Sequence, residues 1–176
     1  GLGDGDLAAH VRTQLDDSLR RLRSEHVDLY QLHHAPADGI DTGVLLETLD
    51  SLVRAGKVRA IGASNFSAWR LAECAQLARE NGWAAFSTVQ DYWHLLARGI
   101  ETEVVPYAER SGIGVLPFHP LGGGYLTGKY VPGAPRPAGT RGANGSGIID
   151  ALDTPGVHAA VQALHAIAQD HGRTVG

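Results

Sequence analysis

The sequence has no methionine and a single cysteine, Cys74. One cysteine excludes an internal disulfide and suits a reducing compartment, and its place in a helical pattern predicts a packed thiol rather than a nucleophile. No apolar run approaches the roughly 20 residues of a membrane-spanning helix, and no signal-peptide pattern appears at the start. The formal net charge of −4 argues against nucleic acid or an anionic membrane as the main partner. We therefore expect a cytoplasmic protein.

The 176 residues are 43% hydrophobic and 19% charged, which is typical of one globular domain with a substantial core. The chain opens on a glycine-rich stretch without an initiator methionine, and it stops at 173–176 within sequence that has the pattern of structure. We expect residues 1–176 to be one partial domain, truncated at both ends.

Apolar spacing predicts an alternation of helices and strands. Helices are expected over about 7–23, 42–55, 67–80, 101–110 and 155–171, and strands over 27–33, 58–63, 86–90 and 114–118. Regular alternation implies right-handed crossovers and a parallel sheet, as in a (β/α)8 barrel or an open doubly wound sheet. No Gly-x-Gly-x-x-Gly lies between a strand and a helix, which disfavours a Rossmann domain. The loop over 128–147 is too long for a plain connector, so we expect it to be functional or mobile.

Polar or aromatic residues stand at the end of every predicted strand. They are His33-His34, Ser64-Asn65, Gln90-Asp91 and Phe118-His119. Each has a structural explanation on its own, such as a hydrogen-bonded histidine, a polar turn or a core aromatic. Because the carboxyl ends of parallel strands converge, all four together predict one site.

Two chemistries fit such a site from the residues alone. A metal could use His33, His34, His94 and His119, but adjacent histidines on a strand point to opposite faces, and no His-x-His or His-Glu-x-x-His pattern occurs. We therefore expect no metal site. The glycine run 122–124 permits close backbone approach by a phosphate and Lys129 adds a cation, although the spacing is not that of a Walker loop.

Four stretches carry a family resemblance. They read DLYQLH over 28–33, GKVRAIGASNF over 56–66, VQDY with LLAR over 89–98, and PLGGGYLTGKY over 120–130. Together they resemble the aldo-keto reductase superfamily, and the last is most similar to the branch of potassium-channel β-subunits and bacterial oxidoreductases. The resemblance implies an α/β fold, a (β/α)8 TIM barrel, of which this chain would hold about four strand–helix units. It also implies NADP(H), or NAD(H), as cofactor and reduction of small aldehydes and ketones by hydride transfer.

The resemblance also implies roles for individual residues. His33 matches the catalytic histidine that orients the carbonyl oxygen, while His34 stands in place of an aromatic that lines the substrate pocket. Ser64, Asn65 and Gln90 match the groups that hold the nicotinamide carboxamide, and Phe118 matches the aromatic that stacks on the ring. The remaining cofactor-binding positions are His119, where serine is common, and the loop residues Pro120, Leu121, Gly122, Gly123 and Lys129, with Arg136 or Arg141 as further phosphate ligands.

The family's catalytic Tyr, Lys and Asp match no residue of this chain, and we expect them before residue 1. Residues 1–176 alone are therefore expected to lack carbonyl reductase activity. Two alternatives remain at this point. One is a regulatory subunit that binds cofactor with little turnover. The other is an unrelated barrel lyase or hydrolase that uses His33 and Asp91.

Overall fold

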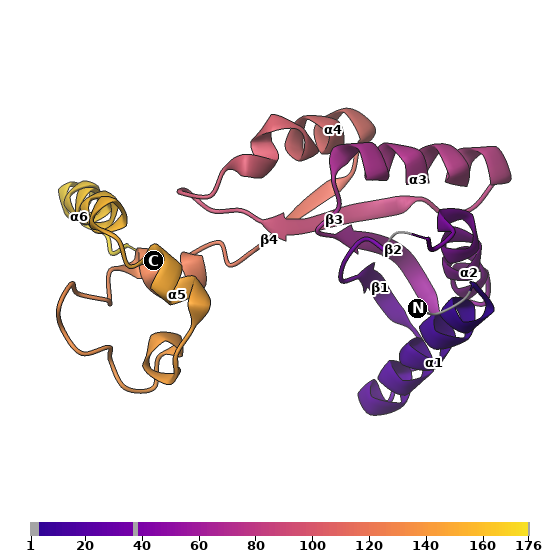
Figure 1. The fold of residues 1–176 in the computed structure, drawn as a ribbon, viewed down its shortest axis with the longest axis horizontal. Helices are drawn as coiled ribbons and strands as arrows, with labels where there is room; N and C mark the ends of the chain where they lie inside the picture. Colours follow the sequence, from indigo (N-terminus) through magenta and orange to yellow (C-terminus); the bar gives the residue numbers. More distant parts are fainter. Residues whose placement is uncertain (1–3, 37–38, 176) are drawn as a thin grey trace. The chain divides into compact units, whose positions relative to one another are not determined.

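The computed structural model describes residues 4–36 and 39–175, whose elements follow one another in the predicted order (Figure 1). The elements are α1 (Asp4–Leu22), β1 (Val27–Leu32), α2 (Thr42–Arg54), β2 (Val58–Ser64), α3 (Ala68–Asn81), β3 (Phe86–Tyr92), the 3-10 turn η1 (Gly99–Thr102), α4 (Val104–Ser111), β4 (Gly114–Phe118), the 3-10 segments η2 (Gly122–Thr127) and η3 (Arg141–Asn144), α5 (Gly147–Leu152) and α6 (Pro155–Asp170). The chain forms two compact units, Gly1–Asp91 with Ile100–Leu116, and Tyr92–Gly99 with Pro117–Gly176. That residues 1–176 belong to one barrel domain stays a prediction.

The four strands form one sheet in the order β1-β2-β3-β4. β1 pairs with β2 in parallel, with Leu29 opposite Ala60 and Gln31 opposite Gly62. β2 pairs with β3 in parallel, with one register shift between Ile61 and Gly62. A sheet in which each new strand is added beside the last is the order of a barrel segment, and the prediction of a parallel sheet is confirmed.

Apolar stripes on the helices form the core of the first unit. The stripe of α1, which includes Leu15, and the stripe of α2, which includes Leu46 and Leu49, are buried as their spacing predicted. Phe66 and Phe86 meet edge to face, with ring centroids 5.6 Å apart. Cys74 lies in this core, as predicted, and burial raises the pKa of its thiol to about 11. The cysteine is therefore a protonated packing residue near neutral pH.

Several helix ends follow local sequence rules. The Asp41 carboxylate accepts the backbone N–H of Gly43 at 2.6 Å and caps α2, and Gly82 and Gly112 close α3 and α4 in the left-handed conformation. Ser67 occupies the predicted N-cap position of α3, but its side chain makes no capping hydrogen bond. The Ser67 carbonyl accepts the Leu71 N–H at 3.1 Å, which is the first hydrogen bond of the helix.

Two predicted elements near the middle of the chain need correction. The helix expected over 101–110 is broken, since η1 precedes α4 and Pro106 lies in the first turn of α4, where its missing N–H costs no helical bond. Tyr92, predicted to lie in a loop, is the last residue of β3. Residues just after it form a single antiparallel bridge, between His94 and Ala97.

The second unit departs furthest from its predicted structure. The glycine run is part of η2, and the predicted loop over 128–147 contains η3. Its small core consists of Tyr125, Leu126, Tyr130, Ile149 and Val161. On α6 only Val161 is buried, and Ile167 is 56% exposed. The amphipathic pattern identified the helix but not the extent of its burial.

Candidate functional site

Ser64 and Asn65 join the ends of three neighbouring strands in the first unit. The Ser64 hydroxyl donates to the Gln90 carbonyl at 2.9 Å, and the Asn65 backbone N–H donates to the same oxygen at 3.0 Å. The Asn65 side-chain nitrogen donates to the His33 carbonyl at 2.9 Å. Asn65 has φ +58, a left-handed conformation that asparagine tolerates better than most residues. The structure thus brings together four predicted site residues, from β1, β2 and β3.

The groups that remain available at these strand ends are amides and an imidazole. Within residues 4–36 and 39–175, the Gln90 side-chain amide and the Asn65 Oδ1 have no hydrogen-bond partner. An amide offers both donors and an acceptor, which is the set needed to pair with a second amide. His33 is exposed, and its ring lies 4.2 Å from that of His34, centroid to centroid.

The two histidines correct one step of the reasoning from sequence. β1 ends at Leu32, so His33 and His34 lie beyond the strand, and their rings are neighbours instead of pointing to opposite faces. In the described part of the chain, no three His, Cys, Asp or Glu side chains are grouped as metal ligands.

A glycine on β2 makes room beneath the strand ends. A Cβ on Gly62 would lie 2.3 Å from Thr88 Oγ1 and 2.9 Å from Gln31 Cγ. Its absence allows Gln31 to reach across β2, where its Nε2 donates to Thr88 Oγ1 at 3.5 Å. The chain therefore uses glycine here for space, since a larger residue would push β1 and β3 side chains apart.

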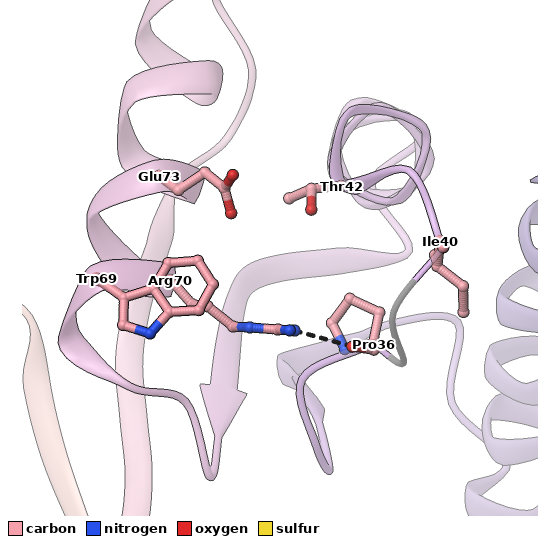
Figure 2. A pocket seen from close by; sticks show the side chains of 7 residues that line it. Pro36, Ile40, Thr42, Trp69, Arg70 and Glu73 are labelled. Atoms are coloured by element: carbon pink, nitrogen blue, oxygen red, sulfur yellow. Dashed lines mark hydrogen bonds between the residues drawn. The ribbon is translucent and has the colours of Figure 1, made fainter.

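Arg70, which the sequence did not single out, supports the loop that follows His33. A pocket of about 210 Å³ lies between this loop and the start of α3, and Figure 2 shows the Arg70 side chain extending across it toward Pro36. Arg70 Nη1 donates to the Pro36 carbonyl at 2.8 Å, and its guanidinium lies 5.1 Å from the centre of the Trp69 ring. The contact joins residues 34 positions apart, and no local sequence pattern predicts it.

In the second unit, the predicted phosphate loop is a backbone turn with two cations beside it. Gly122, Gly123 and Gly124 all have positive φ, and the N–H of Gly122 donates to the His119 carbonyl at 2.7 Å. A Cβ on Gly124 would lie 2.8 Å from Lys129 Nζ, and one on Gly123 would lie 3.6 Å from Arg141 Cδ. The glycines therefore leave space that neighbouring side chains occupy, and Lys129 and Arg141 are among the residues beside the turn.

The two arginines considered for a phosphate role differ, because Arg141 lies beside the glycine turn. Arg136 instead forms ion pairs with Asp150 at 2.6 Å and Asp153 at 3.5 Å. These carboxylates raise the pKa of Arg136, hydrogen bonding to Asp150 being the main cause. Through these ion pairs Arg136 stabilises the loop before α5.

A second polar cluster, also unannounced by the sequence, surrounds Tyr125. Tyr125 is buried, stacks on Tyr130 at 5.3 Å and donates its hydroxyl to Asp153 Oδ1 at 3.0 Å, while His158 Nε2 lies 2.8 Å from the same oxygen. Burial, and then the Asp153 hydrogen bond, raise the pKa of Tyr125 to about 12. Hydrogen bonds from His158 and Tyr125 lower the pKa of Asp153. The cluster joins η2 to the start of α6.

Comparison with known proteins identifies the chain. The model of the aldo/keto reductase family matches residues 3–176. The chain belongs to the aldo/keto reductase family. It is 38% identical to the uncharacterized oxidoreductase YrpG of Bacillus subtilis over 144 residues, which are 80% of this chain and 42% of that protein. It is also 38% identical to human aflatoxin B1 aldehyde reductase member 2 over 120 residues, 68% of this chain and 33% of the relative.

A solved aldo/keto reductase confirms the fold. The glycerol dehydrogenase AKR11B4 from Gluconobacter oxydans superposes with a TM-score of 0.76 at 33% identity, over 96% of this chain and 49% of that one. The four parallel strands and their helices are therefore part of a (β/α)8 barrel, as predicted. The chain spans half or less of the length of these relatives. Among the helices of the described residues, none is both long and apolar enough to cross a bilayer.

Proposed function

We propose that this chain is the cofactor-binding part of an oxidoreductase that uses NADP(H), or NAD(H), to reduce aldehydes and ketones to alcohols. The observation that carries the proposal is the amide pair at the strand ends. Ser64 and Asn65 are fixed by hydrogen bonds to the backbone of β3 and β1, while the Gln90 amide and the Asn65 Oδ1 are left for a ligand. A nicotinamide carboxamide supplies the donors and acceptor that match them.

The second unit supports the same proposal from the phosphate side. His119, Pro120 and Leu121 lead into the turn at Gly122 and Gly123, both of which have positive φ. Lys129 and Arg141 beside the turn would neutralise a pyrophosphate. Phe118, which is half-buried and in contact with the Tyr92 ring at 5.5 Å, offers an aromatic surface for the nicotinamide.

The proposed mechanism gives this chain an orienting role. A nicotinamide held there would supply hydride for the carbonyl carbon. Ser64, Asn65 and Gln90 hold the carboxamide and so choose the ring face that is presented. His33, exposed at the end of β1, donates a hydrogen bond that orients and polarises the carbonyl oxygen.

We assign the proton donor to none of Tyr30, Tyr92 and Tyr125. Burial raises the pKa of both Tyr30 and Tyr92, and the pKa of Tyr125 is raised to about 12. A general acid works best with a pKa near the operating pH, and these shifts go the other way.

The test uses the full-length gene product and changes Gln90. Because its side chain makes no hydrogen bond within the described protein, Gln90→Ala should leave the fold intact while it weakens NADPH binding about tenfold, the loss of one to two hydrogen bonds. NADPH fluorescence titration measures the Kd, and NADPH oxidation with propanal measures turnover. Gln76→Ala on α3, an exposed glutamine whose amide donates to the Glu80 carboxylate, is the matched control.

The outcomes separate the alternatives. Weakened NADPH binding and reduced turnover in Gln90→Ala, with Gln76→Ala unchanged, support the proposal. Tight NADPH binding without reduction of any aldehyde would point to a regulatory subunit. Wild-type protein that binds neither NADPH nor NADH would refute the proposal.

A further inference from the structure

The second unit contains a cavity of about 350 Å³, and among its lining residues only Phe118 is assigned above to the cofactor. It is lined by Tyr92, Phe118, Gly147, Ile148, Ala151 and Leu152. Four of these side chains are aromatic or aliphatic with two or more carbons beyond Cβ, and Gly147 and Ala151 keep the wall at α5 open. Among the lining side chains, the Tyr92 hydroxyl is the only polar group. The volume is at the lower end of small-molecule sites, about 300–1,000 Å³.

His94 determines what the Tyr92 hydroxyl can do. The backbone N–H of Leu96 donates to His94 Nδ1 at 3.1 Å, so Nδ1 carries no proton. The neutral ring must then be protonated at Nε2, which lies 2.8 Å from the Tyr92 oxygen. His94 therefore donates to Tyr92, and the rings hold this geometry edge to face at 4.8 Å.

The surroundings of His94 keep it in that neutral form. The side chain is only 6% exposed, and burial, followed by the nearby His119, lowers its pKa. Since Tyr92 receives a hydrogen bond from His94, its own O–H proton is left over. In the described residues that hydroxyl makes no other hydrogen bond. The Tyr92 hydroxyl can therefore donate a hydrogen bond to a bound ligand.

We propose that this cavity binds the aromatic ring of an aryl aldehyde or aryl ketone substrate, and that Tyr92 donates a hydrogen bond to an acceptor on that ring. The proposal rests on the proposed carbonyl reductase function and narrows its substrate class. Phe118 and Tyr92, tilted by 37° to each other, give a ring two aromatic surfaces to contact. The aliphatic wall from α5 completes the apolar surface.

The same lining disfavours a small polyhydroxylated substrate. Such a molecule would bring several hydroxyl groups into a cavity that offers one donor. Each hydroxyl without a partner there would lose its hydrogen bonds to water, which weakens binding.

The first experiment fills the cavity in the full-length gene product. Ala151→Leu adds three carbons at the α5 wall. It should raise the KM for benzaldehyde and 4-ethylbenzaldehyde at least about tenfold more than the KM for propanal, whose short chain needs no ring site. The matched control is Ala159→Leu, an equally exposed helical alanine on α6 that does not line the cavity. It should leave every KM unchanged.

The second experiment tests the hydroxyl. Tyr92→Phe should raise the KM for at least one methoxybenzaldehyde about threefold to tenfold more than for the ethylbenzaldehyde substituted at the same position. Methoxy and ethyl groups are similar in size, and only methoxy is an acceptor. The ortho, meta and para pairs are all compared. Tyr107→Phe on α4, outside the cavity, is the control.

The results distinguish this proposal from the proposed function. Equal KM changes for all aldehydes in Ala151→Leu, together with a raised Kd for NADPH, would show that the cofactor occupies the cavity and would overturn the proposal. Equal effects of Tyr92→Phe on each methoxy and ethyl pair would overturn the role of the hydroxyl. If the wild-type protein reduces no aldehyde, the carbonyl reductase function fails. Ligand-observed NMR with 4-methoxybenzaldehyde, lost in Ala151→Leu but not in Ala159→Leu, still tests the cavity in that case.

Discussion

The two compact units are held together by different interactions. In the first, long aliphatic side chains of α1 and α2 pack on the sheet, and Leu15, Leu46 and Leu49 are almost entirely removed from water. In the second, two stacked tyrosines and a few aliphatic residues form a small core, beside which Asp153 binds Tyr125, His158 and Arg136. Apolar burial varies little with pH, whereas a carboxylate-centred network depends on it. The units should therefore respond differently to the same disturbance.

The largest effect is expected from a cavity in the first unit. Leu46→Ala should destabilise that unit by about 2–5 kcal/mol, because the site is enclosed by a helix pair and a sheet and collapses little. Hydrogen exchange of the full-length protein should show faster exchange in α2 and β2. Leu95→Ala, at a 50% exposed leucine, is the matched control and should change little. An equal increase in the exchange rate of α6 would show that the two units unfold together, which would contradict the expected difference between them.

A smaller effect is expected from the phenol at the centre of the second unit. Tyr125→Phe keeps the stacking on Tyr130 and removes the hydrogen bond to Asp153, which should cost about 0.5–1.5 kcal/mol. Faster exchange should be confined to η2 and α6, with α2 unchanged. Tyr107→Phe in the first unit serves as the control. An unchanged exchange rate in α6 would mean that packing alone holds this unit.

The mildest test changes only pH. The pKa of Asp153 is lowered in the folded protein, so this carboxylate contributes stability above its unfolded pKa of about 3.9 and loses it as pH falls through the lower folded value. Acid titration followed by hydrogen exchange should therefore show α6 opening below about pH 4 before α2 does. In Asp153→Asn this difference between the two helices should disappear. A difference that persists in the variant would assign the acid sensitivity to another group.

What the sequence predicted follows from how local each signal is. The strand 114–118 and the helix ends at Gly82 and Gly112 were predicted correctly, because periodicity and a glycine in the left-handed region act within a few residues. The strand-end residues of the first unit lie together because parallel strands end at one edge. Whether they and the residues from Phe118 to Lys129 hold one cofactor stays a prediction.

The features that were missed all join distant parts of the chain. Arg70 reaches Pro36, Tyr125 reaches Asp153, and Gly62 makes room for a contact between two other strands. None of these contacts leaves a periodic pattern, since each depends on how elements pack after they form. The exposed face of α6 was missed for a related reason, because amphipathic spacing shows which face would be buried but not whether a partner covers it.

The Gln90 carbonyl oxygen accepts hydrogen bonds from both the Ser64 hydroxyl and the Asn65 backbone, so the proposed nicotinamide site depends on the register of β3 against β2. If β3 slipped by one residue against β2, both bonds would be lost together and the Gln90 amide would turn to the opposite face. A chain whose sheet has the wrong register would then not bind a nicotinamide at these residues. By mass action a bound nucleotide would draw the folding population toward the correct register, so it would act as a folding template as well as a reactant.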